Sequence, residues 1–209
     1  MMDRESEGSL RVAIIGAGYM AREHIRAFSS IRGIEIAGIY SRTRLRAEAL
    51  AAEFGISSIC DSITELYEAT RAELVVVAIP ELEMHKVAVA CFGFTWTVLL
   101  EKPAGYNYEV GVEIASAART HGAKVFVALN RRHYSSTRRV LAALSENSVP
   151  RFIKVQDQED PAQALAGGQP ALVVSNWMYA NSIHLIDFFR VFGRGRIVSV
   201  NLVVPWEAL

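Results

Sequence analysis

The chain has 209 residues, of which 51% are hydrophobic and 21% charged, a composition that excludes wholesale disorder and allows a large folded core. Lys plus Arg and Asp plus Glu number 22 each, so no net charge attracts nucleic acid or an anionic membrane, and we expect neither as a partner. The two cysteines, Cys60 and Cys91, lack metal-ligand spacing and cannot form a disulfide framework. We therefore predict no metal site and a cytoplasmic protein with reduced thiols.

The first ten residues are polar and charged, and we expect a flexible tail there rather than a signal peptide. No apolar run reaches the roughly 18 residues that a membrane-spanning helix needs. Strands and helices then alternate. Strands are expected at 11–15, 34–40, 57–60, 74–79, 96–100 and 124–129, and helices at 19–30, 43–54, 61–68, 83–92 and 107–120. Asp61 is the expected N-cap of the helix at 61–68, and Asn107 is the expected N-cap of the helix at 107–120. This alternation predicts an α/β fold, a doubly wound parallel sheet of the Rossmann type over residues 11–130.

The pattern changes after Asn130. The expected elements there are a helix at 136–145, a strand at 151–156, a polar loop at 157–169, a helix at 181–192 and a strand at 197–204. They predict the start of an α+β substrate or dimerisation domain over residues 131–209. Two strands and a helix bury little apolar surface, so this domain looks partial.

A glycine-rich loop, Gly16-Ala17-Gly18-Tyr19-Met20-Ala21, joins the first strand to the first helix. The first glycine allows a tight turn, and the second leaves room for phosphates, which bind the amides at the helix N-terminus. The alanine packs the helix against the strand. Because the loop has this context in the first βαβ unit, it predicts dinucleotide binding by residues 16–20. A glycine turn without a ligand is the alternative.

The end of the second strand reads Ser41-Arg42-Thr43-Arg44 and lacks the acidic residue that would hold the ribose hydroxyls of NAD. Ser41 can donate to a 2′-phosphate and Arg42 can pair with it. The sequence therefore favours NADP over NAD as the cofactor. The alternative is that Arg42 and Arg44 are exposed charges at the start of a helix.

Several segments, in order and spacing, resemble the glucose–fructose oxidoreductase/inositol dehydrogenase (Gfo/Idh/MocA) family. They are the glycine loop, Ile79-Pro80 with His85 following, the run 98–103 that ends in Glu101-Lys102-Pro103, the run 128–132 and the run 182–187. Glu-Lys-Pro after the fifth strand is a fairly specific sign. The resemblance runs from Arg11 to near Val204, and family members are longer, so the chain is C-terminally short by comparison.

The resemblance implies an NAD(P)-dependent dehydrogenase or reductase that transfers a hydride between the nicotinamide and a carbinol carbon of a sugar, polyol or nucleotide-sugar. By this match Lys102 moves the proton of the reacting hydroxyl, and Glu101 positions the cofactor or the lysine. Ile79 and Pro80 would lie beside the cofactor. The peptide bond before Pro103 is a candidate for the cis form.

His184 matches the histidine that takes part in proton transfer in the family's second domain. Relatives often carry an aspartate four residues earlier, where this chain has Ala180. A satisfied, partly buried histidine is the alternative for His184. The residues that we expect to bind substrate are Asn130, Arg132, Tyr179 and Asn181. For Asn130 and Arg132 a structural hydrogen bond is the alternative.

A second function stays open from the sequence: a non-catalytic dinucleotide-binding sensor or accessory subunit. Ala180 and the short C-terminal part favour it, whereas Lys102 and His184 favour an enzyme. The family's second domain commonly forms a dimer, so the resemblance also implies a homo-oligomer.

Overall fold

The computed structural model describes residues 9–145, 149–193 and 196–201. These residues form two compact units: one from the described residues of Met1–Leu129 and Glu159–Ile183, the other from those of Asn130–Gln158 and His184–Leu209. Residues 159–183, which lie inside the expected 131–209 domain, thus belong with the first unit by their contacts. The assignment of residues 131–209 to one substrate or dimerisation domain stays a prediction.

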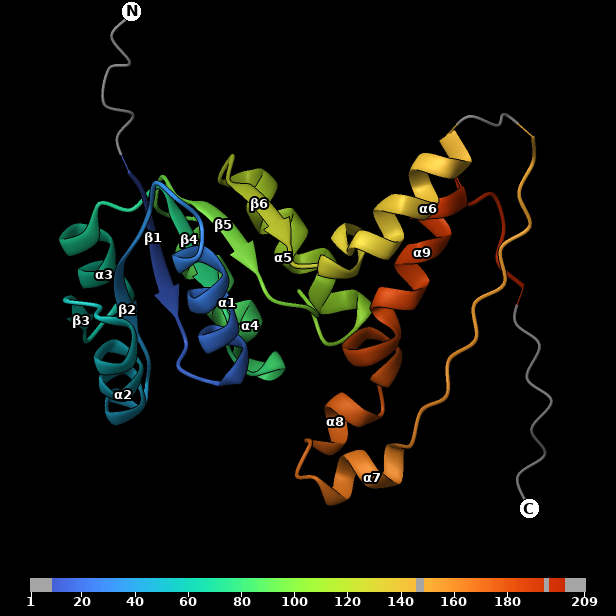
Figure 1. Cartoon of the computed structure of the whole chain (residues 1–209). Coiled ribbons are helices and arrows are strands. Elements are labelled where there is room, and N and C mark those ends of the chain that lie inside the picture. The colour runs from blue at the N-terminus through green and yellow to red at the C-terminus, as the bar shows by residue number, and fades with distance from the viewer. Residues whose placement is uncertain (1–8, 146–148, 194–195, 202–209) are drawn as a thin grey trace, which may run out of the picture. The chain divides into compact units, whose positions relative to one another are not determined.

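A six-stranded parallel sheet forms the centre of the first unit (Figure 1). Its order is β3-β2-β1-β4-β5-β6, the order of a doubly wound dinucleotide-binding sheet, which confirms the expected fold class. The strands are β1 (Leu10–Ile15), β2 (Ile34–Tyr40), β3 (Ile59–Cys60), β4 (Leu74–Val77), β5 (Thr97–Leu100) and β6 (Lys124–Val127). β4 ends before the expected residue 79, because Pro80 has no N–H for a ladder and the chain turns away ahead of it.

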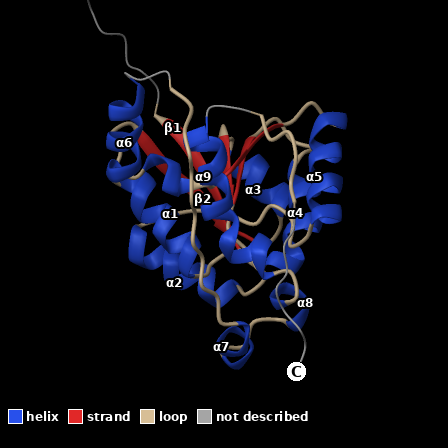
Figure 2. Cartoon of the chain, turned by 90° about the vertical axis from the view of Figure 1, so that its right-hand side faces the viewer, coloured by secondary structure: helices blue, strands red, loops and turns tan. Residues whose placement is uncertain are grey.

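Helices cover both faces of the sheet (Figure 2). They are α1 (Tyr19–Ser29) and α2 (Arg44–Phe54) on one face, and α3 (Ile63–Thr70), α4 (Met84–Cys91) and α5 (Tyr108–Thr120) on the other. Successive side chains of a strand point to opposite faces, so Val12 and Ile14 pack under α1 and α2 while Ala13 and Ile15 join the opposite core. The second part of β1, Val12–Ile15, is therefore buried on both sides, which explains its unbroken apolar run.

Capping residues decide where two of these helices begin. Asn107 caps α5 as expected, since its side-chain oxygen accepts the N–H of Val110 at 2.9 Å. The expected cap at Asp61 is wrong: α3 begins after Ser62, whose hydroxyl accepts the N–H of Glu65 at 3.0 Å. The Glu65 carboxylate reaches back to the N–H of Asp61 at 2.7 Å. This reciprocal arrangement resembles a capping box and satisfies two N–H groups of the helix start.

Beyond β6 the described residues contain helices and irregular segments. The helical elements are η2 (Asn130–His133), α6 (Ser135–Ser145), α7 (Pro161–Ala166), α8 (Ala171–Val174), the π-helical η3 (Met178–Ser182) and α9 (Ile183–Gly193). The expected polar loop at 157–169 is wrong, because Asp160 caps α7 and Pro161 occupies its first turn. That Asp-Pro pair is a helix-start signal.

The expected strands at 151–156 and 197–204 are also wrong over their described residues, which have no regular secondary structure; residues 202–204 lie outside the described part. A strand is stable only beside another strand. Their apolar side chains face solvent instead, with Phe152 92% exposed and Val198 88% exposed. Across the described residues, no helix is long and apolar enough to cross a membrane.

Both thiols lie in the core of the first unit, with Cys60 4% and Cys91 0% exposed. Burial raises the pKa of Cys91 to about 12 and also raises the pKa of Cys60. We expect neither thiol of the folded protein to react with a thiol-specific disulfide reagent near neutral pH, because thiolate and access are both lacking. Both thiols should react once guanidinium unfolds the chain, and rapid labelling of native Cys91 would contradict this core.

The same burial predicts a pH dependence of stability. An unfolded thiol ionises near pH 9, whereas folded Cys91 stays protonated up to about pH 12. The stability that the protonated Cys91 thiol contributes is therefore fully present below pH 9. Above pH 9 the free energy of unfolding falls by at most about 1.4 kcal/mol per pH unit. Urea unfolding of the wild type and of Cys91→Ala between pH 8 and about pH 10.5 measures how the free energy of unfolding changes with pH. The variant should lose less stability over this interval.

Candidate functional site

The glycine loop adopts the geometry that the sequence predicts. Gly16 has φ of 111°, and a Cβ there would lie 2.0 Å from the carbonyl oxygen of Ala78. Its N–H donates to the carbonyl of Tyr40 at 2.8 Å, so the turn is fixed between β2 and the end of β4. A Cβ at Gly18 would meet nothing within 4 Å, which leaves open space at the start of α1.

Helix α1 offers its first amides to that open space. Gly18 is its N-cap, no side chain caps it, and its first turn contains no acidic residue. Unsatisfied amides and the positive end of the helix dipole together favour an anion. Ala21 is completely buried behind them, in the packing between helix and sheet that its position predicts.

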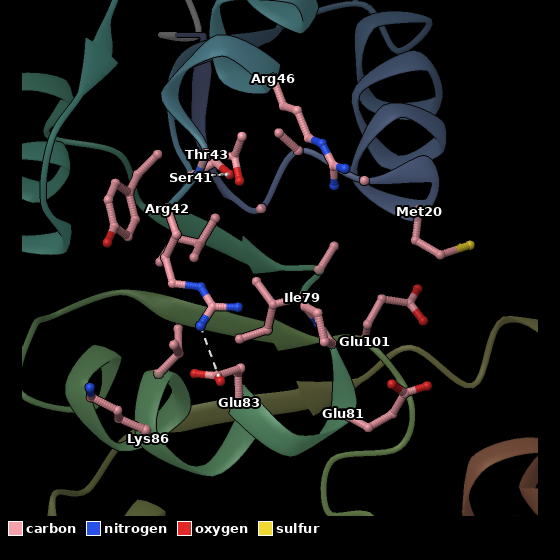
Figure 3. A pocket seen from close by; sticks show the side chains of 18 of the residues that line it. Met20, Ser41, Arg42, Thr43, Arg46, Ile79, Glu81, Glu83, Lys86 and Glu101 are labelled. Atoms are coloured by element: carbon pink, nitrogen blue, oxygen red, sulfur yellow. Dashed lines mark hydrogen bonds and ion pairs between the residues drawn. The ribbon is translucent and has the colours of Figure 1, made fainter. Parts of the chain in front are cut away.

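One cavity of about 530 Å³ extends from this loop along the carboxyl ends of the strands, within the first unit. It is lined by every residue that we predict to bind the cofactor: Gly16, Ala17, Gly18, Tyr19, Met20, Ser41, Arg42, Ile79, Pro80, Glu101 and Lys102. These residues come from loops that follow β1, β2, β4 and β5 (Figure 3). Binding at this edge is the rule for doubly wound sheets.

The end of β2 brings more polar groups to the cavity than the sequence analysis named. Thr43 and Arg46 also line it, and the N–H of Thr43 donates to the hydroxyl of Ser41 at 3.3 Å (Figure 3). Arg46 lies in the first turn of α2 (Arg44–Phe54), the helix that follows this loop. Arg44 instead pairs with Glu48 and Asp61, which places it among the exposed charges of the alternative interpretation.

Arg42 has a partner that the sequence did not indicate. Its guanidinium lies 3.1 Å from the carboxylate of Glu83, which stands in η1 (Glu81–Glu83) on the opposite wall (Figure 3). Lys86, in α4, and Glu81 complete the charged lining of that wall.

Glu101, at the end of β5, contacts both His24 in α1 and the backbone of Lys102. Glu101 is only 6% exposed. One of its carboxylate oxygens forms a hydrogen bond of 2.7 Å with Nε2 of His24. Its other oxygen accepts the backbone N–H of Lys102 at 3.1 Å. The end of β5 is thereby tied to α1, which fits the positioning role expected of Glu101. No local pattern could have revealed His24, because 77 residues separate the pair.

The side chain of Lys102 is anchored as well. Its ammonium donates to the carbonyl of Ala180 at 2.9 Å, and both residues belong to the first unit. The Lys102–Pro103 peptide bond is cis, as the sequence analysis considered. Ala180, where the family resemblance implies an aspartate, offers the lysine a backbone oxygen and no carboxylate. Ala180 lies in η3, and single-turn π segments often occur at functional sites.

A carboxylate that the sequence analysis left in a loop holds η3 in place. Glu159 accepts hydrogen bonds from the indole N–H of Trp177 at 2.8 Å and from the amide of Asn181 at 2.9 and 2.7 Å. The hydroxyl of Ser182 adds a third donor at 3.3 Å. Asn181 is thus already engaged, and its substrate-binding role, like that of Tyr179 in the same element, stays a prediction.

The remaining predicted residues belong to the second unit. Arg132 donates from two nitrogens to the buried carboxylate of Asp187, and this interaction raises the pKa of the guanidinium. Arg132 therefore has a structural partner, as its alternative interpretation requires. Asn130 is exposed at the start of η2, and His184 is 7% exposed in α9. No group of three or more His, Cys, Asp or Glu side chains within the described residues could hold a metal ion.

Comparisons with known proteins show the family of the chain. A family model described as oxidoreductase family, NAD-binding Rossmann fold (GFO_IDH_MocA), matches residues 10–129, more than half of the chain. The matched region coincides with the sheet, the helices that cover it and the cavity.

Individual relatives extend the match beyond the sheet. The chain is 27% identical over 146 residues to glucose-6-phosphate 3-dehydrogenase of Bacillus subtilis (strain 168), a match covering 70% of this chain and 41% of the relative. It is 22% identical over 201 residues to 4-carboxy-2-hydroxymuconate-6-semialdehyde dehydrogenase of Sphingobium sp., with coverages of 93% and 62%. The solved apo scyllo-inositol dehydrogenase of Lactobacillus casei shares the fold with a TM-score of 0.71 at 18% identity, covering 91% of this chain and 56% of that one. The chain therefore spans less than two thirds of the length of these relatives.

Proposed function

Since the chain belongs to the Gfo/Idh/MocA oxidoreductase family, we propose that it binds NADP(H) in the cavity and transfers a hydride between the nicotinamide and a carbinol carbon of a sugar or polyol. The observation that carries this proposal is the single cavity that holds the glycine loop, Ser41 and Arg42, and Lys102. Phosphate-binding and proton-transferring groups thus line one space of suitable size for a cofactor.

The residues present fit a dinucleotide. Gly16 and Gly18 leave the backbone approachable, and the uncapped start of α1 supplies amides for a pyrophosphate. Ile79 and Pro80 offer an apolar wall between the two ends of the cavity. A preference for NADP is supported by Ser41, Thr43 and Arg46, whose hydroxyls and guanidinium can bind a 2′-phosphate at the end of β2.

Lys102 supports the reaction type. When bound, the nicotinamide accepts or supplies the hydride, and the substrate hydroxyl must lose or gain its proton in the same step. A neutral lysine accepts that proton, and the ammonium returns it in the reverse direction. The ammonium has three N–H donors, and Ala180 takes one of them, so two remain for the substrate oxygen. Glu101 would hold the backbone of Lys102 in place, and we propose His184 as the second proton-handling group.

The substrate class is proposed from the relatives. One relative is named for glucose 6-phosphate and one solved neighbour for scyllo-inositol, both of which carry secondary hydroxyl groups. We accordingly propose a secondary alcohol of a sugar or polyol as the reacting group. The two buried thiols fit the reducing cytoplasm as its location.

The test measures binding and turnover separately. Titration with NADPH and NADH, followed by ligand fluorescence, should give binding with NADPH the tighter ligand. Turnover should then appear with at least one member of a panel of inositols, hexose phosphates, glycosides and nucleotide-sugars, with a semialdehyde included because of the second relative. Absence of binding by both dinucleotides would reject the proposal, and tighter NADH would reject the NADP preference.

The anchoring of Lys102 on Ala180 favours one alternative. Because the lysine is held by a backbone carbonyl and no carboxylate at Ala180, we propose as the second function a dinucleotide-binding sensor or accessory subunit without turnover. Full cofactor binding without turnover on the whole panel would support that second function.

A further inference from the structure

The ion pair between Arg42 and Glu83 crosses the end of the cavity where the adenosine of a dinucleotide would lie. Arg42 follows β2, and Glu83 comes from η1 after β4, so the pair joins two walls of the cavity (Figure 3). The side chains are 65% and 36% exposed, respectively, and an entering ligand can therefore reach both. We infer that Glu83 is a specificity-determining residue that weakens NADP binding relative to NAD by competing with the 2′-phosphate for Arg42.

Competition follows from the charges. A phosphate monoester carries about −1.5 to −2 charges at neutral pH. It would approach Arg42 where the carboxylate of Glu83 already lies 3.1 Å from the guanidinium. The phosphate must either displace Glu83, which breaks the ion pair, or bind beside it against the repulsion of a like charge. NAD has ribose hydroxyls at this position, and hydroxyls donate to a carboxylate without either cost.

Glu83 thus supplies, from the β4 side of the cavity, the acidic group that the sequence lacks after β2. Among the cations that line the cavity, only Arg42 is paired with a carboxylate of the described residues. Arg46 and Lys86 line the cavity and form no ion pair with any residue in the described ranges, while Arg44 is turned to Glu48 and Asp61. Arg46 therefore stays available for the phosphate, whereas binding to Arg42 requires either displacement of Glu83 or a phosphate placed beside its carboxylate.

Glu81 provides a matched control. It lies in the same turn and lines the same cavity, but its side chain points away from Arg42 and toward the other end (Figure 3). Loss of its charge should affect NAD and NADP alike. A change in the ratio of the two affinities is therefore specific to Glu83.

The test rests on the proposed binding of a dinucleotide and uses the whole chain. Dissociation constants for NADPH and NADH are measured at low ionic strength for the wild type, Glu83→Gln, Glu81→Gln, Arg42→Gln and the double variant Arg42→Gln/Glu83→Gln. Glu83→Gln should tighten NADPH about two- to fivefold and leave NADH within about twofold, as expected for release of an exposed ion pair. Glu83→Lys should extend the gain, and about 0.5 M salt should reduce it.

The outcomes separate the inference from the proposed function. The inference is supported if the NADPH gain is absent in Glu81→Gln and shrinks in the Arg42→Gln background. It is overturned, with the proposed function intact, if both dinucleotides bind but Glu83→Gln and Glu83→Lys leave their affinity ratio unchanged. If neither dinucleotide binds the wild type, the proposed function fails and the inference falls with it. Circular dichroism and thermal unfolding show that the variants are folded.

Discussion

Replacement of Lys102 by methionine is expected to lower kcat about 10²- to 10⁴-fold, the usual contribution of a positioned acid–base group. Methionine keeps most of the length and apolar stem of lysine but can neither accept nor donate the proton. The affinity for NADPH should change by less than about threefold, because the pyrophosphate and adenosine groups are bound elsewhere in the cavity. Turnover is measured with the substrate that the panel identifies, and NADPH binding is measured in the same preparations.

Lys124→Met is the matched control for this substitution. Lys124 begins β6, is exposed, and lies 5.8 Å from the ring centre of Phe126 rather than in the cavity. Its replacement should leave kcat unchanged. A kcat for Lys102→Met within about threefold of the wild type would assign the proton transfer to another residue, with His184 as the first candidate. Partial rescue of Lys102→Ala by small amines would support the assignment of the proton transfer to Lys102.

Replacement of Gly16 by alanine is expected to destabilise the first unit by about 2–4 kcal/mol, from backbone strain and overpacking combined. The residue has φ of 111°, which is unfavourable for alanine, and the added methyl would lie 2.0 Å from the carbonyl oxygen of Ala78. That oxygen belongs to the backbone after β4, so the ends of β1 and β4 must move apart to admit the methyl group. Urea unfolding, followed by circular dichroism, measures the loss.

Gly18→Ala separates folding from binding in the same loop. Its φ is −94°, and a Cβ there meets no atom within 4 Å, so stability should change by less than about 1 kcal/mol. The methyl would nevertheless occupy the space proposed for the pyrophosphate, and affinity for both dinucleotides should fall about tenfold or more. Equal stability losses in the two variants would contradict the geometry of the loop, and unchanged binding in Gly18→Ala would contradict its proposed role.

Local patterns were sufficient for the framework of the cofactor site. Strand periodicity, the glycine loop and the cap at Asn107 are encoded within a few residues, and each is present where the sequence predicts it. That Ser41, Arg42 and Lys102 line one cavity was predictable because each follows a strand of a parallel sheet, and the carboxyl ends of such strands meet at one edge. The roles of these residues stay predictions. Element ends were less certain, as the shift from Asp61 to Ser62 illustrates.

The partners of these residues depend on pairs that are distant in the chain. His24 and Glu101 are 77 residues apart, Lys102 and Ala180 are 78 apart, and Arg132 and Asp187 are 55 apart. The two expected strands beyond residue 150 failed for the same reason, since a strand needs a neighbour that its own sequence does not specify.

By itself, then, the sequence determined the α/β sheet and the dinucleotide loop, because both follow from local conformational preference and strand periodicity. The lysine at the end of β5 was indicated by the resemblance of Glu101-Lys102-Pro103 to the Gfo/Idh/MocA family. Only the tertiary structure decided which charges meet: Glu83 with Arg42 across the cavity, Glu101 with His24, and Lys102 with Ala180. These pairings arise where separate elements pack against one another, and no periodicity or spacing along the chain encodes them.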